Sequence, residues 1–392
     1  MRKLAGPLLS LGVVLFTLIC LEFGLSKLAP LPDPFESLKN KHRVNRYLKM
    51  ENPPNIRILT EAEPGLPGMS GRKTYSTNNL GHRGEDLVIP KPSGEFRIFL
   101  VGGSTVECFY LDDLESLESV LEAELRRLLS DGERIKVYNT GRSGARSDDH
   151  TALLVHQIAH LEPDLIVVFT GVNDLTASIY NLDYLHRTVE VPESETEIMA
   201  FPLLVRMVAT EFQIPRRLYR LFMRAGSRQE QQILEQIPTV SDYRDKVALR
   251  RSAPVSNIFP RVDTLSYRNN LTTMVGICRA HGARLVFMTQ QSTWNSPDSG
   301  VEAWHWLRYR NGVNYRPDYM DRALEMLNEE MRKISRNQSI PLYDLASRMP
   351  KTLEYFYDDI HFNVKGARTA ATELAALIAE EALIKPAGRQ SN

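Results

Sequence analysis

The sequence has no excess of either charge and very little cysteine. Its 392 residues include 48 Lys and Arg against 48 Asp and Glu, so no basic excess indicates a nucleic-acid partner. The three cysteines are too few for a disulfide framework, and Cys20 lies in an apolar tract, which leaves at most one bridge. Cysteine content therefore says almost nothing about the redox compartment.

The sequence also lacks the glycine patterns of phosphate-binding loops, since neither Gly-x-Gly-x-x-Gly nor the P-loop occurs. His156 and His160 are four residues apart in a predicted helix, a spacing that can bind zinc. This helix has no glutamate in a His-Glu-x-x-His arrangement, and its other face is apolar. Packing or surface histidines are therefore favoured, and we expect neither a metal nor an organic cofactor.

The N-terminal segment is apolar. After Arg2 and Lys3, residues 4–21 carry no charge, and 18 residues are near the lower limit for a helix that spans a bilayer. A cleaved signal peptide is the alternative, but Lys27-Leu28-Ala29 is a poor cleavage site. We therefore expect residues 1–28 to form a single-pass membrane anchor. The flanking lysines do not decide its orientation. A basic stub before an apolar tract is typical of an export signal, so we expect an extracytoplasmic, periplasmic catalytic domain.

The rest of the chain divides by composition. Residues 29–93 are rich in Pro, Gly and Asn and predict a stalk and an irregular lead-in. Apolar strands and amphipathic helices then alternate over residues 94–385, which predicts an α/β fold with a parallel sheet between two helical layers. The predicted strands are 96–101, 136–138, 164–169, 284–289 and 340–343. A charged helical insertion interrupts this pattern at about 176–260, and residues 386–392 form a tail.

Polar loops follow the predicted strands and would meet at one edge of the sheet, where such folds place their active sites. Ser104 follows the first strand, and Asp358 and His361 precede the last helix. A serine hydroxyl needs a neighbouring base, and His361 is the best candidate. Asp358, three residues earlier, would orient the imidazole and stabilise its charged form. We therefore predict a catalytic triad of these three residues.

The same edge of the sheet offers donors for an oxyanion. We expect the backbone N–H groups of Ser104 and Gly141 and the side-chain amide of Asn173 to form the oxyanion hole. Each motif alone favours a simpler interpretation: Ser104 and Asn173 as helix caps, and Gly141 as a turn glycine. It is the conjunction of all of them that favours a catalytic site.

These motifs resemble the SGNH (GDSL-like) hydrolase superfamily. Ser104, Gly141, Asn173 and His361 stand in the family's order, with Asp358 in a D-x-x-H motif and residues 171–174 as G-x-N-D. Gly103 replaces the aspartate of Gly-Asp-Ser. That exchange resembles a bacterial membrane-anchored branch, as does the segment Thr-Asn-x-x-Gly-x-Arg-Gly at residues 77–84. The resemblance implies a flavodoxin-like three-layer fold and a serine esterase without a cofactor.

The expected activity is hydrolysis of a carboxylic ester through an acyl-enzyme, with an acylated small molecule or carbohydrate as substrate. An acyltransferase with a sugar acceptor would share the same first half-reaction. A non-catalytic carbohydrate-binding or assembly protein is a further alternative, but it would not need Ser104, Asp358, His361 and Asn173 together.

Cys108 is expected to be a buried thiol. The arginines at 216, 217, 220 and 224 predict a basic helix, packed over the site or resting on a membrane.

Overall fold

The computed structural model describes residues 2–30, 48, 52–61, 65–129, 134–180, 212–215, 217, 240–310 and 312–384. The chain forms two compact units. One comprises residues 1–44 and 185–237, and the larger unit comprises residues 45–184 and 238–392. Each is described by itself.

The smaller unit contains the helix α1 (Arg2–Leu28), which includes the apolar tract at 4–21. The ends of this helix carry the charged residues Arg2, Lys3, Glu22 and Lys27. Within the described residues, no helix combines the length and the hydropathy that a bilayer crossing requires. The predicted helix is therefore present, whereas the predicted transmembrane anchor is not supported.

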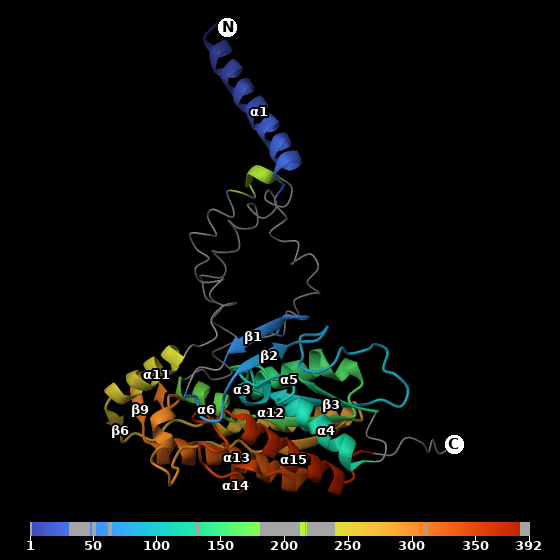
Figure 1. Cartoon of the computed structure of the whole chain (residues 1–392), viewed down its shortest axis with the longest axis vertical. Helices are drawn as coiled ribbons and strands as arrows, with labels where there is room; N and C mark the ends of the chain where they lie inside the picture. The colour runs from blue at the N-terminus through green and yellow to red at the C-terminus, as the bar shows by residue number, and fades with distance from the viewer. Residues whose placement is uncertain are drawn as a thin grey trace. The chain divides into compact units, whose positions relative to one another are not determined.

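The larger unit is built on a five-stranded parallel sheet (Figure 1). Its strands lie in the order β10 (Leu342–Tyr343), β7 (Arg284–Met288), β5 (Leu165–Phe169), β3 (Phe96–Gly102) and β4 (Ile135–Asn139). All five were predicted, because each is a short run rich in apolar residues. Numbered along the chain, they give the order 2-1-3-4-5, which is the flavodoxin-like arrangement.

Helices cover both faces of this sheet, as the alternating strands and helices predicted. One face packs against α4 (Leu117–Leu128) and α15 (Val364–Glu380), which lie side by side (Figure 1). The opposite face packs against α5 (Ser147–His156), α6 (Val172–Ile179), α12 (Thr264–Ala280) and α13 (Pro317–Gln338). Side chains alternate along β3: Ile98 and Leu100 enter the first layer, while Phe99 and Val101 enter the second. Burial on both faces explains why the strands are apolar throughout.

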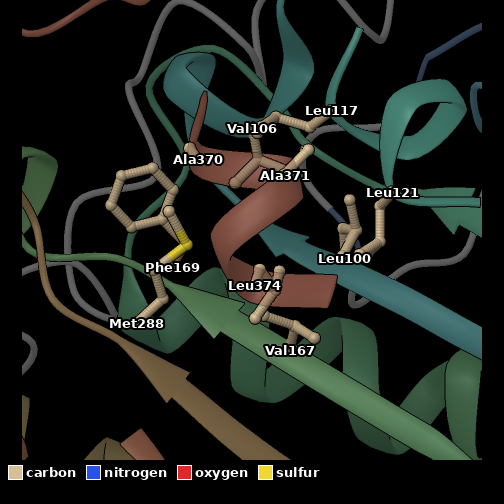
Figure 2. Close-up of a pocket in the computed structure, with 10 residues that line it drawn as sticks. All are labelled: Leu100, Val106, Leu117, Leu121, Val167, Phe169, Met288, Ala370, Ala371 and Leu374. Atoms are coloured by element: carbon tan, nitrogen blue, oxygen red, sulfur yellow. The ribbon is translucent and has the colours of Figure 1, made fainter. Parts of the chain in front are cut away.

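A very short helix, α3 (Ser104–Glu107), follows β3 and is seated in the first layer through Val106. Figure 2 shows Val106 beside Leu117 and Ala371, at a core cavity of about 10 Å³. A cavity of this size and apolar lining holds no substrate. The packing around this cavity has a structural role. Val106 packs into the core and so holds α3, which begins at Ser104, against the sheet.

Two small sheets were not predicted. β1 (Arg57–Glu61) and β2 (Arg72–Ser76) pair antiparallel inside the region expected to be irregular. They escape recognition because charged residues interrupt both strands. A three-stranded sheet joins β6 (Val255–Ser256), β9 (Val313–Tyr315) and β8 (Tyr309–Arg310).

The predicted insertion at 176–260 lies largely outside the described residues. Its first part continues α6, and its last part contains α11 (Val240–Ser252) and β6. The remaining described elements are short helices: η2 (Ile158–Leu161), η3 (Val301–Trp304) and α14 (Leu345–Arg348).

Candidate active site

The candidate site lies where the strand order changes direction. Ser104 begins α3 directly after β3, and Asn173 lies in the first turn of α6, directly after β5. β3 and β5 are neighbours in the sheet, but their connections lead to opposite faces. Such a switch point leaves a crevice at the carboxyl ends of the strands, which is where ligands bind in sheets of this kind.

Three side chains form a continuous hydrogen-bonded chain at this edge of the sheet. The Nε2 atom of His361 lies 2.7 Å from the Oγ atom of Ser104. On the other side of the imidazole, Nδ1 lies 2.7 Å from Oδ2 of Asp358. Residues 257 positions apart are therefore brought into the arrangement that nucleophilic catalysis by serine requires.

The orientation of Asp358 is fixed by four donors. Its Oδ1 accepts the backbone N–H groups of Ile360 (2.9 Å) and His361 (2.7 Å). Its Oδ2 accepts the Nδ1–H of His361 and the indole N–H of Trp306, the latter at 3.0 Å. The carboxyl group is fully buried. Sequence patterns did not single out Trp306, because nothing in its local sequence marks a contact 52 residues away.

The electrostatic environment favours the charged form of His361. Burial by itself lowers the pKa of the imidazole, but the adjacent Asp358 carboxylate and its hydrogen bond outweigh this effect, so the pKa is raised above its ordinary value. Tyr357 stacks on the ring with a centroid distance of 5.5 Å and an interplanar angle of 10°. The histidine is therefore prepared to accept and hold the proton of Ser104.

The side-chain amide of Asn173 lies where the prediction placed it, beside the Ser104 turn. One of its N–H groups donates to the carbonyl of Ala145 at 2.8 Å, which leaves the second hydrogen of the amide for a ligand. A Cβ atom on Gly103 would lie 2.6 Å from the Nδ2 atom of Asn173. Glycine at 103, in place of aspartate, is what makes room for this amide.

Gly141, whose backbone N–H was predicted to be an oxyanion donor, lies beside α3. Its backbone N–H donates to the side-chain oxygen of Asn139 at 2.9 Å, so the structure directs this donor into the protein. A Cβ atom at 141 would lie 2.2 Å from the backbone nitrogen of Glu107. Glycine is therefore required because the β4 loop packs against the backbone of α3. The structure thus places Gly141 beside the turn that begins at Ser104, with its N–H bonded to Asn139.

Arg83, in the Thr-Asn-x-x-Gly-x-Arg-Gly segment, is a fully buried support of the same turn. Its guanidinium donates to the carbonyls of Glu107 (3.0 Å), Cys108 (2.7 Å) and Leu111 (3.1 Å). It also pairs with Asp113 at 3.0 Å and lies 3.4 Å from Glu118. The first two carbonyls belong to the last turn of α3, so Arg83 satisfies acceptors that a four-residue helix leaves open. The motif was noted from the sequence, but its role was not.

The carboxylate of the G-x-N-D motif, Asp174, has a structural role. Asp174 is partly buried and accepts the hydroxyls of Ser147 (2.5 Å) and Thr170 (3.2 Å), and desolvation raises its pKa to about 6. It therefore ties the start of α6 to the start of α5. Gly171, before it, has φ of +148°, which side chains rarely adopt.

The other candidates from the sequence take no part in this site. Cys108 is buried, as predicted. Among the described residues, no group of three or more His, Cys, Asp or Glu side chains could hold a metal ion. Of the four arginines of the predicted basic helix, only Arg217 lies within the described residues.

Comparison with known proteins identifies a protein family that this chain matches. The family model of the GDSL-like lipase/acylhydrolase family matches residues 100–369, which include Ser104, Asn173, Asp358 and His361. No curated protein matches the chain.

Several solved structures are similar in fold. An acetylxylan esterase from Geobacillus stearothermophilus is 13% identical, with 76% of this chain and 98% of that chain covered and a TM-score of 0.41. A lipase/acylhydrolase from Enterococcus faecalis is 15% identical, with 75% and 100% covered and a TM-score of 0.39. An α/β hydrolase from the metagenome of Lake Arreo is 13% identical, with 75% and 99% covered and a TM-score of 0.40.

The support of α3 by Arg83 can be tested by Arg83→Lys. A lysine keeps the charge but lacks the planar fork of donors, so buried carbonyls of α3 lose their partners. We expect a loss of about 2–4 kcal/mol in the free energy of unfolding, together with slower covalent labelling of Ser104 by a fluorophosphonate. Urea denaturation and the labelling rate measure the two effects. Arg126→Lys, which changes a half-exposed helix ion pair, is the matched control and should alter neither. Wild-type stability and labelling in Arg83→Lys would contradict this role.

Proposed function

Because this chain belongs to the GDSL-like lipase/acylhydrolase family and is an ester hydrolase, we propose that Ser104 is its nucleophile and that hydrolysis proceeds through an acyl-enzyme. The observation that carries the proposal is the pair of 2.7 Å hydrogen bonds that joins Ser104 to His361 and His361 to Asp358.

The roles of the three residues follow from their contacts. As Oγ of Ser104 attacks the ester carbonyl carbon, Nε2 of His361 takes the hydroxyl proton, and Asp358 stabilises the imidazolium through Nδ1–H. When the C–O bond of the ester breaks, the imidazolium returns that proton to the leaving alkoxide. A water molecule, deprotonated by the same imidazole, then attacks the acyl-serine and releases the carboxylic acid.

The negative charge of the tetrahedral intermediate requires donors at the same place. We propose the backbone N–H of Ser104, at the start of α3, and the remaining N–H of Asn173 for this role. Gly141 remains part of the proposal only as the packing surface of α3, because its N–H is held by Asn139.

The proposed substrate is an acyl or acetyl ester on a carbohydrate or lipid of the cell envelope. The ester class rests on the family, and the envelope rests on the basic residues and apolar tract at the N-terminus. A sugar hydroxyl that replaces water in the second half-reaction would give acyl transfer with the same residues.

The nucleophile is tested on the full chain with p-nitrophenyl acetate and a fluorophosphonate probe. We expect the wild type to release p-nitrophenol and to carry the probe on Ser104, as located by peptide mass spectrometry. Ser104→Ala should remove the label and nearly all turnover. A folded wild-type protein that remains unlabelled at Ser104 would reject this nucleophile.

The oxyanion donor is tested by Asn173→Ala, which should lower kcat by about 100-fold with a smaller change in KM. Gly103→Ala should reproduce much of this loss, because the new methyl group occupies the position of the Asn173 amide. The double variant should then be no slower than the slower single variant. Gly276→Ala is the control, since no atom lies within 4 Å of the added methyl group there. Fully multiplicative effects of the two substitutions would show that Gly103 and Asn173 act independently.

We also propose an extracytoplasmic location for the larger unit. Arg2 and Lys3 before the uncharged tract at 4–21 support it, as a sequence typical of export signals. Protease added to intact spheroplasts should digest the larger unit without lysis. Complete protection until lysis would place it in the cytoplasm.

A further inference from the structure

Two cations gather around the tryptophan that contacts the catalytic carboxylate. The ammonium of Lys246, on α11, lies 4.6 Å from the centroid of the Trp306 ring. The guanidinium carbon of Arg310, on β8, lies 5.3 Å from the same centroid. Two like charges held against the same ring repel each other. Trp306 itself is partly exposed, so the group is open to solvent on one side.

The carboxylates around this group already have partners of their own. Glu302 pairs with Arg308 at 2.5 Å and with Arg250 at 3.3 Å. Asp358 is paired with His361. Asp359 accepts the indole N–H of Trp294 at 2.6 Å and the backbone N–H groups of Trp306 (2.6 Å) and Leu307 (3.2 Å). Within the part of the chain that the structure describes, no carboxylate forms an ion pair with Lys246 or Arg310.

The guanidinium of Arg310 makes few hydrogen bonds for a partly buried side chain. Its one hydrogen bond among the described residues is from Nη1 to the carbonyl of Tyr309, at 2.9 Å, and its Nε–H is buried without an acceptor. Burial lowers its pKa more than the distant charges of Tyr180 and Asp359 raise it. A cation held in this state is stabilised by an anion that brings its own acceptors.

The group is linked to His361 through Asp358. Trp306 donates to Oδ2 of Asp358, the atom that also holds Nδ1 of His361. His361 protonates the leaving alcohol in the proposed mechanism, so the alcohol part of the ester lies on the histidine side of the site. A charged group on that part of the substrate is the one positioned to reach the tryptophan.

We propose that Lys246, Arg310 and Trp306 form an anion-binding subsite, and that the enzyme prefers esters whose alcohol part carries a carboxylate or phosphate. The inference rests on the proposed function of Ser104 and His361. The guanidinium of Arg310 offers paired donors to such a group, and the ring of Trp306 offers an apolar surface to the carbon skeleton beside it.

The test compares two acetyl esters that differ in charge on the alcohol part. 4-Acetoxybenzoate carries a carboxylate, and 4-acetoxybenzamide is its neutral counterpart; acetate release measures both, corrected for their rates of alkaline hydrolysis. We expect a ratio of kcat/KM that favours the acid, and a fall in that ratio by about tenfold in Arg310→Gln or Lys246→Gln. Added salt should lower the ratio in the wild type.

Arg322→Gln is the matched control, because it removes an exposed cation that lies over another ring, that of Phe259, at 5.4 Å. It should leave the ratio and the turnover of both esters unchanged. A wild-type ratio near one, or a ratio that Arg310→Gln and Lys246→Gln leave unchanged, would overturn the subsite. A wild type that cleaves neither ester and is not labelled at Ser104 would instead reject the proposed function on which the subsite rests.

Discussion

The site depends on holding a helix of only four residues. α3 has too few internal hydrogen bonds to be stable alone, since the first turn of a helix is costly to form. Its position is imposed from three directions. Val106 enters the core, Arg83 binds the carbonyls at its end, and the Asn139 side chain donates to the carbonyl of Val106 at 2.6 Å. The position of Ser104 beside His361 is therefore set by residues that have no part in the proposed chemistry.

The loop that carries Asp358 and His361 is also held in place by residues outside the site. Asp358 and Asp359 are adjacent, fully buried carboxylates, an arrangement that is unfavourable unless each is fully hydrogen-bonded. The two indole groups of Trp294 and Trp306 supply one donor to each. Burial of both carboxylates therefore couples the orientation of His361 to the segment at 293–307. Trp306 belongs to this segment, and Arg310, on β8 just after it, lies over the Trp306 ring.

The sequence predicted those parts of the fold and of the candidate site that are marked by a short, local sequence pattern. The five strands were recognisable as apolar runs. Ser104 was recognisable from its place after a strand, and Asp358 and His361 from their spacing and their place before the last helix. Trp306 was not, because its contact with Asp358 is between side chains 52 residues apart. The N–H of Gly141 was assigned to the oxyanion on residue type and order alone. Nothing in that pattern reveals that the neighbouring Asn139 would accept it. β1 and β2 were missed because polar residues on one face leave no apolar run.

The exchange of aspartate for glycine at position 103 follows from packing. In this chain the amide of Asn173 lies so close to the backbone of residue 103 that any Cβ there would collide with its nitrogen. An aspartate would therefore displace the amide of Asn173, unless α6 or the turn at Ser104 moved. α6 cannot move easily, since Asp174 ties its first turn to Ser147. α3 cannot either, since Arg83 and Val106 hold it. With both helices fixed, glycine is the one residue that lets Asn173 and Ser104 face the same point.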